Sequence, residues 1–196
     1  WAEDLDKVGE ESPIHPAWIS HCLDRIKGED AIVIKESPVM VNQMRFTKPG
    51  TMIGGGAGGG LGYGLGAALG AKMAAPDRLV ICTQGDGAYM FGNPVPAHYV
   101  ARAEDLPILT VVFNNEHWGA VKRNTRAMYP DGYAAKSNRE PLTFFEPDSG
   151  FEHAAEGAGG YGEKVTVASE LPGALERAMN VIENEGRQAL LNVICS

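Results

Sequence analysis

The sequence has few cysteines and no long apolar run. Only Cys22, Cys82 and Cys195 occur among 196 residues, far apart and each inside an apolar pattern. This placement favours small buried core residues and fits a reducing compartment, so we expect a cytoplasmic protein. No stretch reaches the apolar length of a membrane span, and no signal peptide opens the chain. We therefore expect no membrane contact.

Positive charge is also scarce. The chain has 17 Lys and Arg against 25 Asp and Glu, a formal net charge of −8, and it has no basic stripe. Contacts to phosphates of nucleic acids or anionic lipids need clustered Lys and Arg. The charge therefore argues against nucleic acid as a partner. No internal repeat is present, and the length suits one domain with a full core.

The first fifteen residues lack a hydrophobic pattern. They are acidic, so we interpret residues 1–15 as a linker or arm and residues 16–196 as the folded domain. The chain begins with Trp1 rather than Met, which favours a fragment or a processed chain.

Short apolar runs alternate with helical patterns along the rest of the chain. Strands are predicted at residues 31–34, 79–83, 108–113, 164–167 and 189–194. Helices are predicted from Pro16 to Gly28, over 61–73, over 95–103, over 151–158, and from a cap at Ser169 to Gly186. In the third of these, Val95, Tyr99, Val100 and Ala103 are expected to face inward. This alternation predicts an α/β fold, a doubly wound, mostly parallel sheet of about six strands with helices on both faces.

Polar motifs follow two of the predicted strands. Gly85-Asp86-Gly87 comes after residues 79–83, and Asn114-Asn115 comes after residues 108–113. In an open parallel sheet, ligands bind at the carboxyl ends of the strands. A carboxylate and a carboxamide supply hard oxygen ligands for a small cation, and the N–H groups of Gly87 and Ala88 suit a phosphate. The residues therefore predict a site for Mg²⁺ and a diphosphate.

Residues 54–66 hold much of the glycine. Gly54, Gly56 and Gly59 match the G-x-G-x-x-G pattern of dinucleotide sites, but Lys48-Pro49-Gly50 precedes them rather than a strand. An acid at the end of the following strand is also missing, since Asp77 lies before that strand. Two alternatives stay open: the glycines let a helix pack tightly on the sheet, or they let the backbone approach a flat ligand.

Residues 124–149 are rich in Pro, Asn, Asp and Gly and carry several aromatic side chains. The segment is too long for a simple connection between two elements of a compact domain. It is either a mobile functional loop or an interface segment.

The pairing of Gly85-Asp86-Gly87 with Asn114-Asn115, across 26 residues, resembles the signature of thiamine-diphosphate enzymes. The wider stretch from Glu36 to Lys122 resembles the cofactor-binding domain of the acetolactate synthase, benzoylformate decarboxylase and pyruvate decarboxylase family. Glu36-Ser37, residues 59–62 and residues 114–120 have counterparts there. Residues 125–196 match in architecture only. The resemblance implies the thiamine-diphosphate-binding fold.

The resemblance also implies a ligand set. Asp86 would bind Mg²⁺ through its carboxylate, Asn115 through its side-chain oxygen and His117 through its backbone carbonyl. The side chain of His117 is then exposed or packed rather than catalytic. The residues implied to contact thiamine diphosphate are Gly59, Gly60, Leu61, Gly85, Asp86, Gly87, Ala88, Asn115, His117, Trp118, Gly119 and Ala120.

The implied function is that of a lyase or transferase, a 2-oxo acid decarboxylase or carboligase that uses Mg²⁺ and thiamine diphosphate. In this family the activating glutamate belongs to a separate pyrimidine-binding domain or subunit of the same enzyme. We therefore expect this chain to be one part of a larger enzyme and to form a homo-oligomer. Alone, it should be inactive and bind the cofactor weakly. Two alternatives are a non-catalytic module that keeps the cofactor fold and a dinucleotide-binding domain.

Two further charged residues are candidates for the substrate pocket. Glu36 follows the first predicted strand and is either a structural strand-end carboxylate or a group near the substrate. Arg45 is either an ordinary exposed arginine or a partner for a substrate carboxylate.

Overall fold

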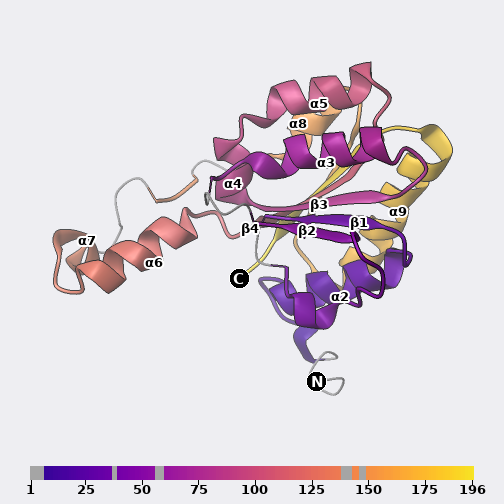
Figure 1. Cartoon of the computed structure of the whole chain (residues 1–196). Coiled ribbons are helices and arrows are strands. Elements are labelled where there is room, and N and C mark those ends of the chain that lie inside the picture. Colours follow the sequence, from indigo (N-terminus) through magenta and orange to yellow (C-terminus); the bar gives the residue numbers. More distant parts are fainter. Residues whose placement is uncertain (1–6, 37–38, 56–59, 138–142, 146–148) are drawn as a thin grey trace.

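The computed structural model describes residues 7–36, 39–55, 60–137, 143–145 and 149–196, and it places a parallel sheet between two helical layers (Figure 1). Within these residues the sheet has six strands in the order β2-β1-β3-β4-β6-β5, and every pairing is parallel. The strands are β1 (Ile32–Lys35), β2 (Met52–Gly54), β3 (Val80–Gly85), β4 (Leu109–Asn114), β5 (Tyr161–Val165) and β6 (Ala189–Ile194). The predicted α/β fold class is confirmed.

Helices cover both faces of the sheet because its buried strands are apolar on both sides. In β4, Val111 belongs to the same hydrophobic cluster as Leu23 and Leu175 on one face, whereas Val112 belongs to the cluster that contains Leu65 on the other. The first face is covered by α2 (Pro16–Ile26) and α9 (Leu171–Glu185), and the second by α3 (Tyr63–Ala74), α5 (Pro94–Ala103) and α8 (Glu152–Gly157). Cys22, Cys82 and Cys195 are all buried, as predicted.

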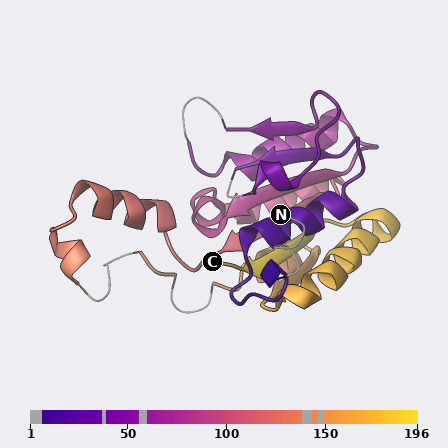
Figure 2. The same ribbon diagram turned by 90° about the horizontal axis from the view of Figure 1, so that it is seen from below.

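The remaining elements lie around the carboxyl edge of the sheet. The short α4 (Asp86–Phe91) follows β3 directly. The helices α6 (Gly119–Met128) and α7 (Tyr133–Lys136) project outward from the body of the domain (Figures 1 and 2). Two 3₁₀ turns, η1 (Val41–Gln43) and η2 (Ala168–Glu170), complete the described elements. Among the described residues, no helix combines the length and apolar character needed to cross a membrane.

Two strands differ from the predictions. The pattern did not predict β2, because it is a three-residue edge strand whose Met52 and Ile53 are exposed. Its last residue is Gly54, so a strand does precede the glycine-rich segment, and that objection to a dinucleotide site was wrong. Residues 56–59, which complete the glycine pattern, lie outside the described residues. β5 begins at Tyr161 rather than 164, and the predicted Val167 is exposed.

The helix predictions need two corrections. Val95, Tyr99 and Val100 are 44–58% exposed and Ala103 is exposed too, so the expected inward face of α5 is wrong. His98 and Ala101 are buried instead, because the polar His98 ring has buried partners. Ser169 does not cap the last helix, which begins at Leu171 after η2 with no side-chain cap.

Residues 1–15 and the glycine-rich helix show two smaller differences from the predictions. Ile14 is fully buried, and its backbone N–H donates to the carbonyl of Ile194 at 3.2 Å, so the end of the predicted arm is docked on β6. The division of the chain into a linker or arm (residues 1–15) and a folded domain (residues 16–196) remains our proposal. Met73, the last apolar residue of the helix predicted over 61–73, is 61% exposed.

A buried histidine joins α4 and α5 to the start of β6. The Tyr89 hydroxyl lies 2.6 Å from His98 Nε2, and Gln188 Oε1 lies 2.7 Å from His98 Nδ1. Gln188 Nε2 also donates to the His98 carbonyl at 2.8 Å, so Gln188 Oε1 is the acceptor on its other side. His98 Nδ1 therefore carries the proton, and Nε2 accepts from Tyr89. Desolvation lowers the pKa of His98.

This histidine predicts a loss of stability in acid. A depressed pKa in the folded state means that the unfolded chain takes up a proton first, so stability falls as the pH drops below the unfolded value of about 6.5. We expect the His98→Gln variant to show a flatter free energy of unfolding between about pH 7 and pH 5 than the parent, measured by urea denaturation. His21→Gln, on α2, is the control. Equal pH slopes for the parent and His98→Gln would contradict the assignment.

Candidate metal and diphosphate site

The two predicted motifs meet at the carboxyl edge of the sheet. β3 and β4 are neighbours, with Gly85 opposite Phe113 in the register. The backbone N–H of His117 points at both motifs, because it lies 3.1 Å from Asp86 Oδ2 and 3.1 Å from Asn115 Oδ1. Two oxygens from different loops therefore lie beside one nitrogen, as a shared cation would require.

Asp86 is a buried carboxylate. It is 4% exposed, and its Oδ1 accepts from the Gly87 N–H at 2.7 Å. Desolvation raises the pKa of Asp86, and hydrogen bonds from the backbone N–H groups of Gly87 and His117 oppose that rise. A divalent cation beside the carboxylate would favour its ionised form.

His117 presents its main chain rather than its ring to the site. Its ring packs on Phe144, with centroids 4.3 Å apart, and its Nδ1 contacts the Asn115 carbonyl. The His117 carbonyl accepts from the Gly119 N–H at 2.7 Å and keeps a second lone pair. That lone pair is the donor available to a metal ion.

A cavity with a volume of 280 Å³ lies over the two motifs. Eleven of its lining residues were predicted from the sequence: Glu36, Leu61, Gly85, Asp86, Gly87, Ala88, Asn115, His117, Trp118, Gly119 and Ala120. Leu61 is 50% exposed, as expected of a large apolar side chain that contacts a ligand rather than the core. Gly60 does not line this cavity, and Gly59 lies outside the described residues.

The glycines of the site leave room that a side chain would fill. A Cβ at Gly87 would lie 2.9 Å from Cε3 of Trp118, and a Cβ at Gly119 would lie 3.0 Å from Nδ2 of Asn115. A side chain at either position would therefore collide with Trp118 or Asn115 of the site. The described residues contain no group of three or more His, Cys, Asp or Glu side chains able to hold a metal. Mg²⁺ fits such a site, since it is commonly bound by one or two carboxylates together with phosphate oxygens.

Glu36 caps the glycine-rich helix. Its carboxylate accepts from the backbone N–H groups of Gly62, Tyr63 and Gly64 at the start of α3, and from Gln84 Nε2 on β3. Hydrogen bonds from three backbone donors hold this carboxylate in place and satisfy the orphan N–H groups of the helix. Glu36 also lines the cavity, so both of its predicted roles stay compatible with its position.

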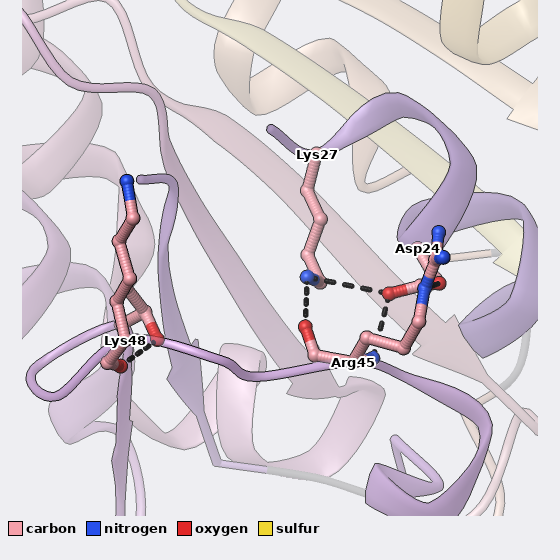
Figure 3. Close-up of polar contacts among 5 residues, drawn as sticks. Asp24, Lys27, Arg45 and Lys48 are labelled. Atoms are coloured by element: carbon pink, nitrogen blue, oxygen red, sulfur yellow. Dashed lines mark hydrogen bonds and ion pairs between the residues drawn. The ribbon is translucent and has the colours of Figure 1, made fainter. Parts of the chain in front are cut away.

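Arg45 lies away from the cavity, in the segment between η1 and β2. Its Nε donates to Asp24 Oδ2 at 3.0 Å and its backbone N–H donates to Asp24 Oδ1 at 2.7 Å, as Figure 3 shows. Lys27, the residue that follows α2, completes this surface cluster by contacting both Asp24 and the Arg45 carbonyl. The Arg45 side chain is 83% exposed and is not among the residues that line the cavity.

Sequence reasoning missed five lining residues: Phe113, Val121, Arg123, Cys195 and Ser196. Arg123 could have been found, because it lies four residues after Gly119 on the same face of α6. Cys195 could not, because only the placement of β6 beside β4 brings it near Asp86. Burial and the nearby Asp86 raise the pKa of Cys195 to about 12, so the thiol is protonated at neutral pH.

The fold and the site together define a class of protein, an α/β domain with a cavity at the carboxyl ends of the neighbouring strands β3 and β4, where carboxylate and amide oxygens suit a divalent cation. Comparison with known proteins agrees: residues 36–193 match the thiamine pyrophosphate enzyme family, C-terminal TPP binding domain. The chain belongs to this family. Thiamine pyrophosphate is another name for thiamine diphosphate, and enzymes of this kind also use Mg²⁺.

Relatives support the same conclusion. An acetolactate synthase large subunit of Mycobacterium tuberculosis is 32% identical over 204 residues, which cover 98% of this chain and 34% of that protein. A sulfoacetaldehyde acetyltransferase of Castellaniella defragrans is 27% identical over 201 residues, which cover 98% of this chain and 32% of that protein. The chain therefore spans about a third of the length of these relatives.

A solved structure shows the same fold. The thiamine diphosphate-dependent 4-hydroxybenzoylformate decarboxylase of Rhodococcus jostii superposes with a TM-score of 0.79 at 27% sequence identity. The match covers 95% of this chain and 33% of that chain. The predicted family and fold are confirmed.

Proposed function

We propose that this chain is the part of a 2-oxo acid decarboxylase or carboligase that binds Mg²⁺ and the diphosphate of thiamine diphosphate. The observation that supports this most directly is that Asp86 Oδ2 and Asn115 Oδ1 lie next to the same His117 N–H in one cavity. Relatives named as an acetolactate synthase and a decarboxylase support the reaction class.

Different residues of the cavity would hold different parts of the cofactor. Asp86, Asn115 and the His117 carbonyl would bind the cation, and the backbone N–H groups of Ala88 and Ala120, in the first turns of α4 and α6, would face the diphosphate. Leu61 would contact the organic part of the cofactor. When bound, thiamine diphosphate supplies an electron sink for cleaving the bond next to a carbonyl group. This chain's own residues bind and orient the cofactor and exclude water from its phosphates.

A second part of the enzyme is also proposed, because the activating glutamate of this family belongs to a pyrimidine-binding domain. α4 and α5 expose apolar side chains that a domain of that kind would cover. These are Met90, Phe91, Val95, Tyr99 and Val100, each 44–64% exposed. The same surface supports the proposal that the enzyme is an oligomer.

Calorimetric titration of the 196-residue chain tests this function. We expect thiamine diphosphate to bind in the presence of Mg²⁺ and to bind far more weakly when EDTA removes the metal, because cation and diphosphate bind together. NAD should give no binding heat, and the chain alone should not decarboxylate 2-oxo acids. Binding of NAD instead of thiamine diphosphate would replace this proposal with a dinucleotide site.

A further inference from the structure

A line of buried side chains runs from α8 to the loop that carries Asn115. Asn192 Nδ2 of β6 donates to Glu152 Oε2 of α8 at 2.7 Å, and Asn114 Nδ2 of β4 donates to Asn192 Oδ1 at 2.9 Å. Asn114 Oδ1 then accepts from the Glu116 backbone N–H at 2.9 Å. Asn192 and Asn114 are fully buried, and Glu152 is 9% exposed.

The two ends of this line, a carboxylate and a backbone N–H, set the direction of every hydrogen bond between them. An ionised carboxylate only accepts, so the amide of Asn192 must turn its NH₂ toward Glu152 and its oxygen toward Asn114. Asn114 must in turn present its NH₂ to Asn192. Its oxygen is left facing the Glu116 N–H. The acceptor at Glu152 and the donor at Glu116 therefore require the same orientation of both amides, and the line joins α8 to the loop.

The loop needs this support because its backbone is strained. Glu116 has a φ of +59°, a left-handed conformation that residues other than glycine adopt at a cost of about 1 kcal/mol or more. The next residue, His117, donates the N–H that lies beside Asp86 and Asn115. A loop relaxed at Glu116 would therefore move the Asn115 oxygen away from Asp86.

Glu152 reaches this position because α8 packs unusually closely on β5. A Cβ at Gly162 would lie 2.4 Å from the backbone oxygen of Glu152, so only glycine allows this approach. The family signature contains none of Glu152, Gly162 or Asn192. All three lie within residues 36–193, which match the family model, but outside the motifs that carry the resemblance.

We propose that Glu152, acting through Asn192 and Asn114, is a positioning residue that holds the 114–117 loop in the conformation that binds the metal. It contacts neither the cation nor the cofactor. The part of this inference that concerns metal binding rests on the proposed function, whereas the part that concerns loop conformation does not.

Amide hydrogen exchange of the metal-free chain tests the conformational part. We expect Glu152→Ala to speed exchange of the Glu116 and His117 amides about tenfold or more, relative to the Ile81 amide of β3, which reports global opening. Glu152→Gln should have a smaller effect, since its amide oxygen can still accept from Asn192. Glu156→Ala, on the same helix, is the matched control and should leave the loop unchanged.

The outcomes separate the inference from its alternatives. Unchanged exchange at Glu116 and His117 in Glu152→Ala would overturn it, and so would an equal increase at Ile81, which would mean that α8 stabilises the whole fold. In an Asn114→Ala background the Glu152→Ala substitution should have no effect on exchange in the loop, because the series of hydrogen bonds is already broken at Asn114. A persisting effect would show that Glu152 acts by another route and would also overturn the inference.

Metal affinity then tests the link to function. Titration with Mn²⁺ in the presence of thiamine diphosphate should show about tenfold weaker binding by Glu152→Ala than by the parent. If exchange at the loop rises while Mn²⁺ affinity is unchanged, the positioning role stands and the proposed metal role of Asn115 fails. The two failures are therefore distinguishable.

Discussion

Replacing Asp86 by Asn should reduce Mg²⁺-dependent binding of thiamine diphosphate by about 100-fold or more, since Asp86 is the only charged group among the proposed metal ligands. The substitution keeps the size of the side chain and removes its charge. One of its two acceptor oxygens becomes an NH₂ group, which then faces the N–H of either Gly87 or His117. Calorimetry with the metal and cofactor measures the change.

The same substitution should leave the metal-free fold intact, because two effects on stability oppose each other. Burial raises the pKa of Asp86, so at neutral pH the ionised carboxylate costs stability that a neutral amide does not. The mismatched NH₂ group loses a hydrogen bond worth about 1 kcal/mol. We expect a free energy of unfolding within about 1 kcal/mol of the parent, measured by urea denaturation.

Asp105→Asn is the matched control. Asp105 is exposed and has a φ of +49°, a conformation that Asn tolerates well, so this variant should bind and fold like the parent. If Asp86→Asn binds Mg²⁺ and thiamine diphosphate with the parent's affinity, the proposed metal site is wrong.

The largest expected loss of stability comes from Gly62→Ala, at about 2–4 kcal/mol. Gly62 has a φ of +85°, and an added Cβ would lie 2.4 Å from the Cα of Gly92 at the end of α4. Backbone atoms on both sides cannot rotate away as a flexible side chain could. The clash would separate the start of α3, which follows Leu61, from the helix that carries Asp86.

Gly66→Ala is the control, and we expect it to change the stability in the opposite direction. Gly66 lies inside α3 with open space around it, so alanine should stabilise the chain by about 0.5–1 kcal/mol. Urea denaturation of both variants measures the two changes. Should Gly62→Ala unfold at the same urea concentration as the parent, the close approach of Gly62 to Gly92 would be refuted.

Most of the candidate site could be predicted from the sequence alone, because its residues are local motifs at strand ends. An apolar run followed by Gly85-Asp86-Gly87, and another followed by Asn114-Asn115, already place their oxygens at one edge of a parallel sheet. The predicted strand at 189–194 coincides with β6, and the others overlap observed strands. Periodicity could not show β2, because an exposed edge strand of three residues carries almost no pattern.

Helix faces were predicted less well where polar side chains are buried. The apolar residues of α5 suggested the wrong inward face, since the buried position belongs to His98, which Tyr89 and Gln188 satisfy. Glu36 illustrates the same limit. Its capping of α3 joins residues 26 to 28 positions apart, which no local pattern reveals.

The sequence by itself determined the class of fold and the cation-binding residues that we propose, because both depend on residue type and on spacing within short segments. The tertiary structure alone decided the strand order, and with it which distant residues meet. Only because β6 lies beside β4 can Asn192 connect Glu152 to Asn114. Strand order depends on long-range pairing and packing, and the period of a single strand carries no information about its neighbours.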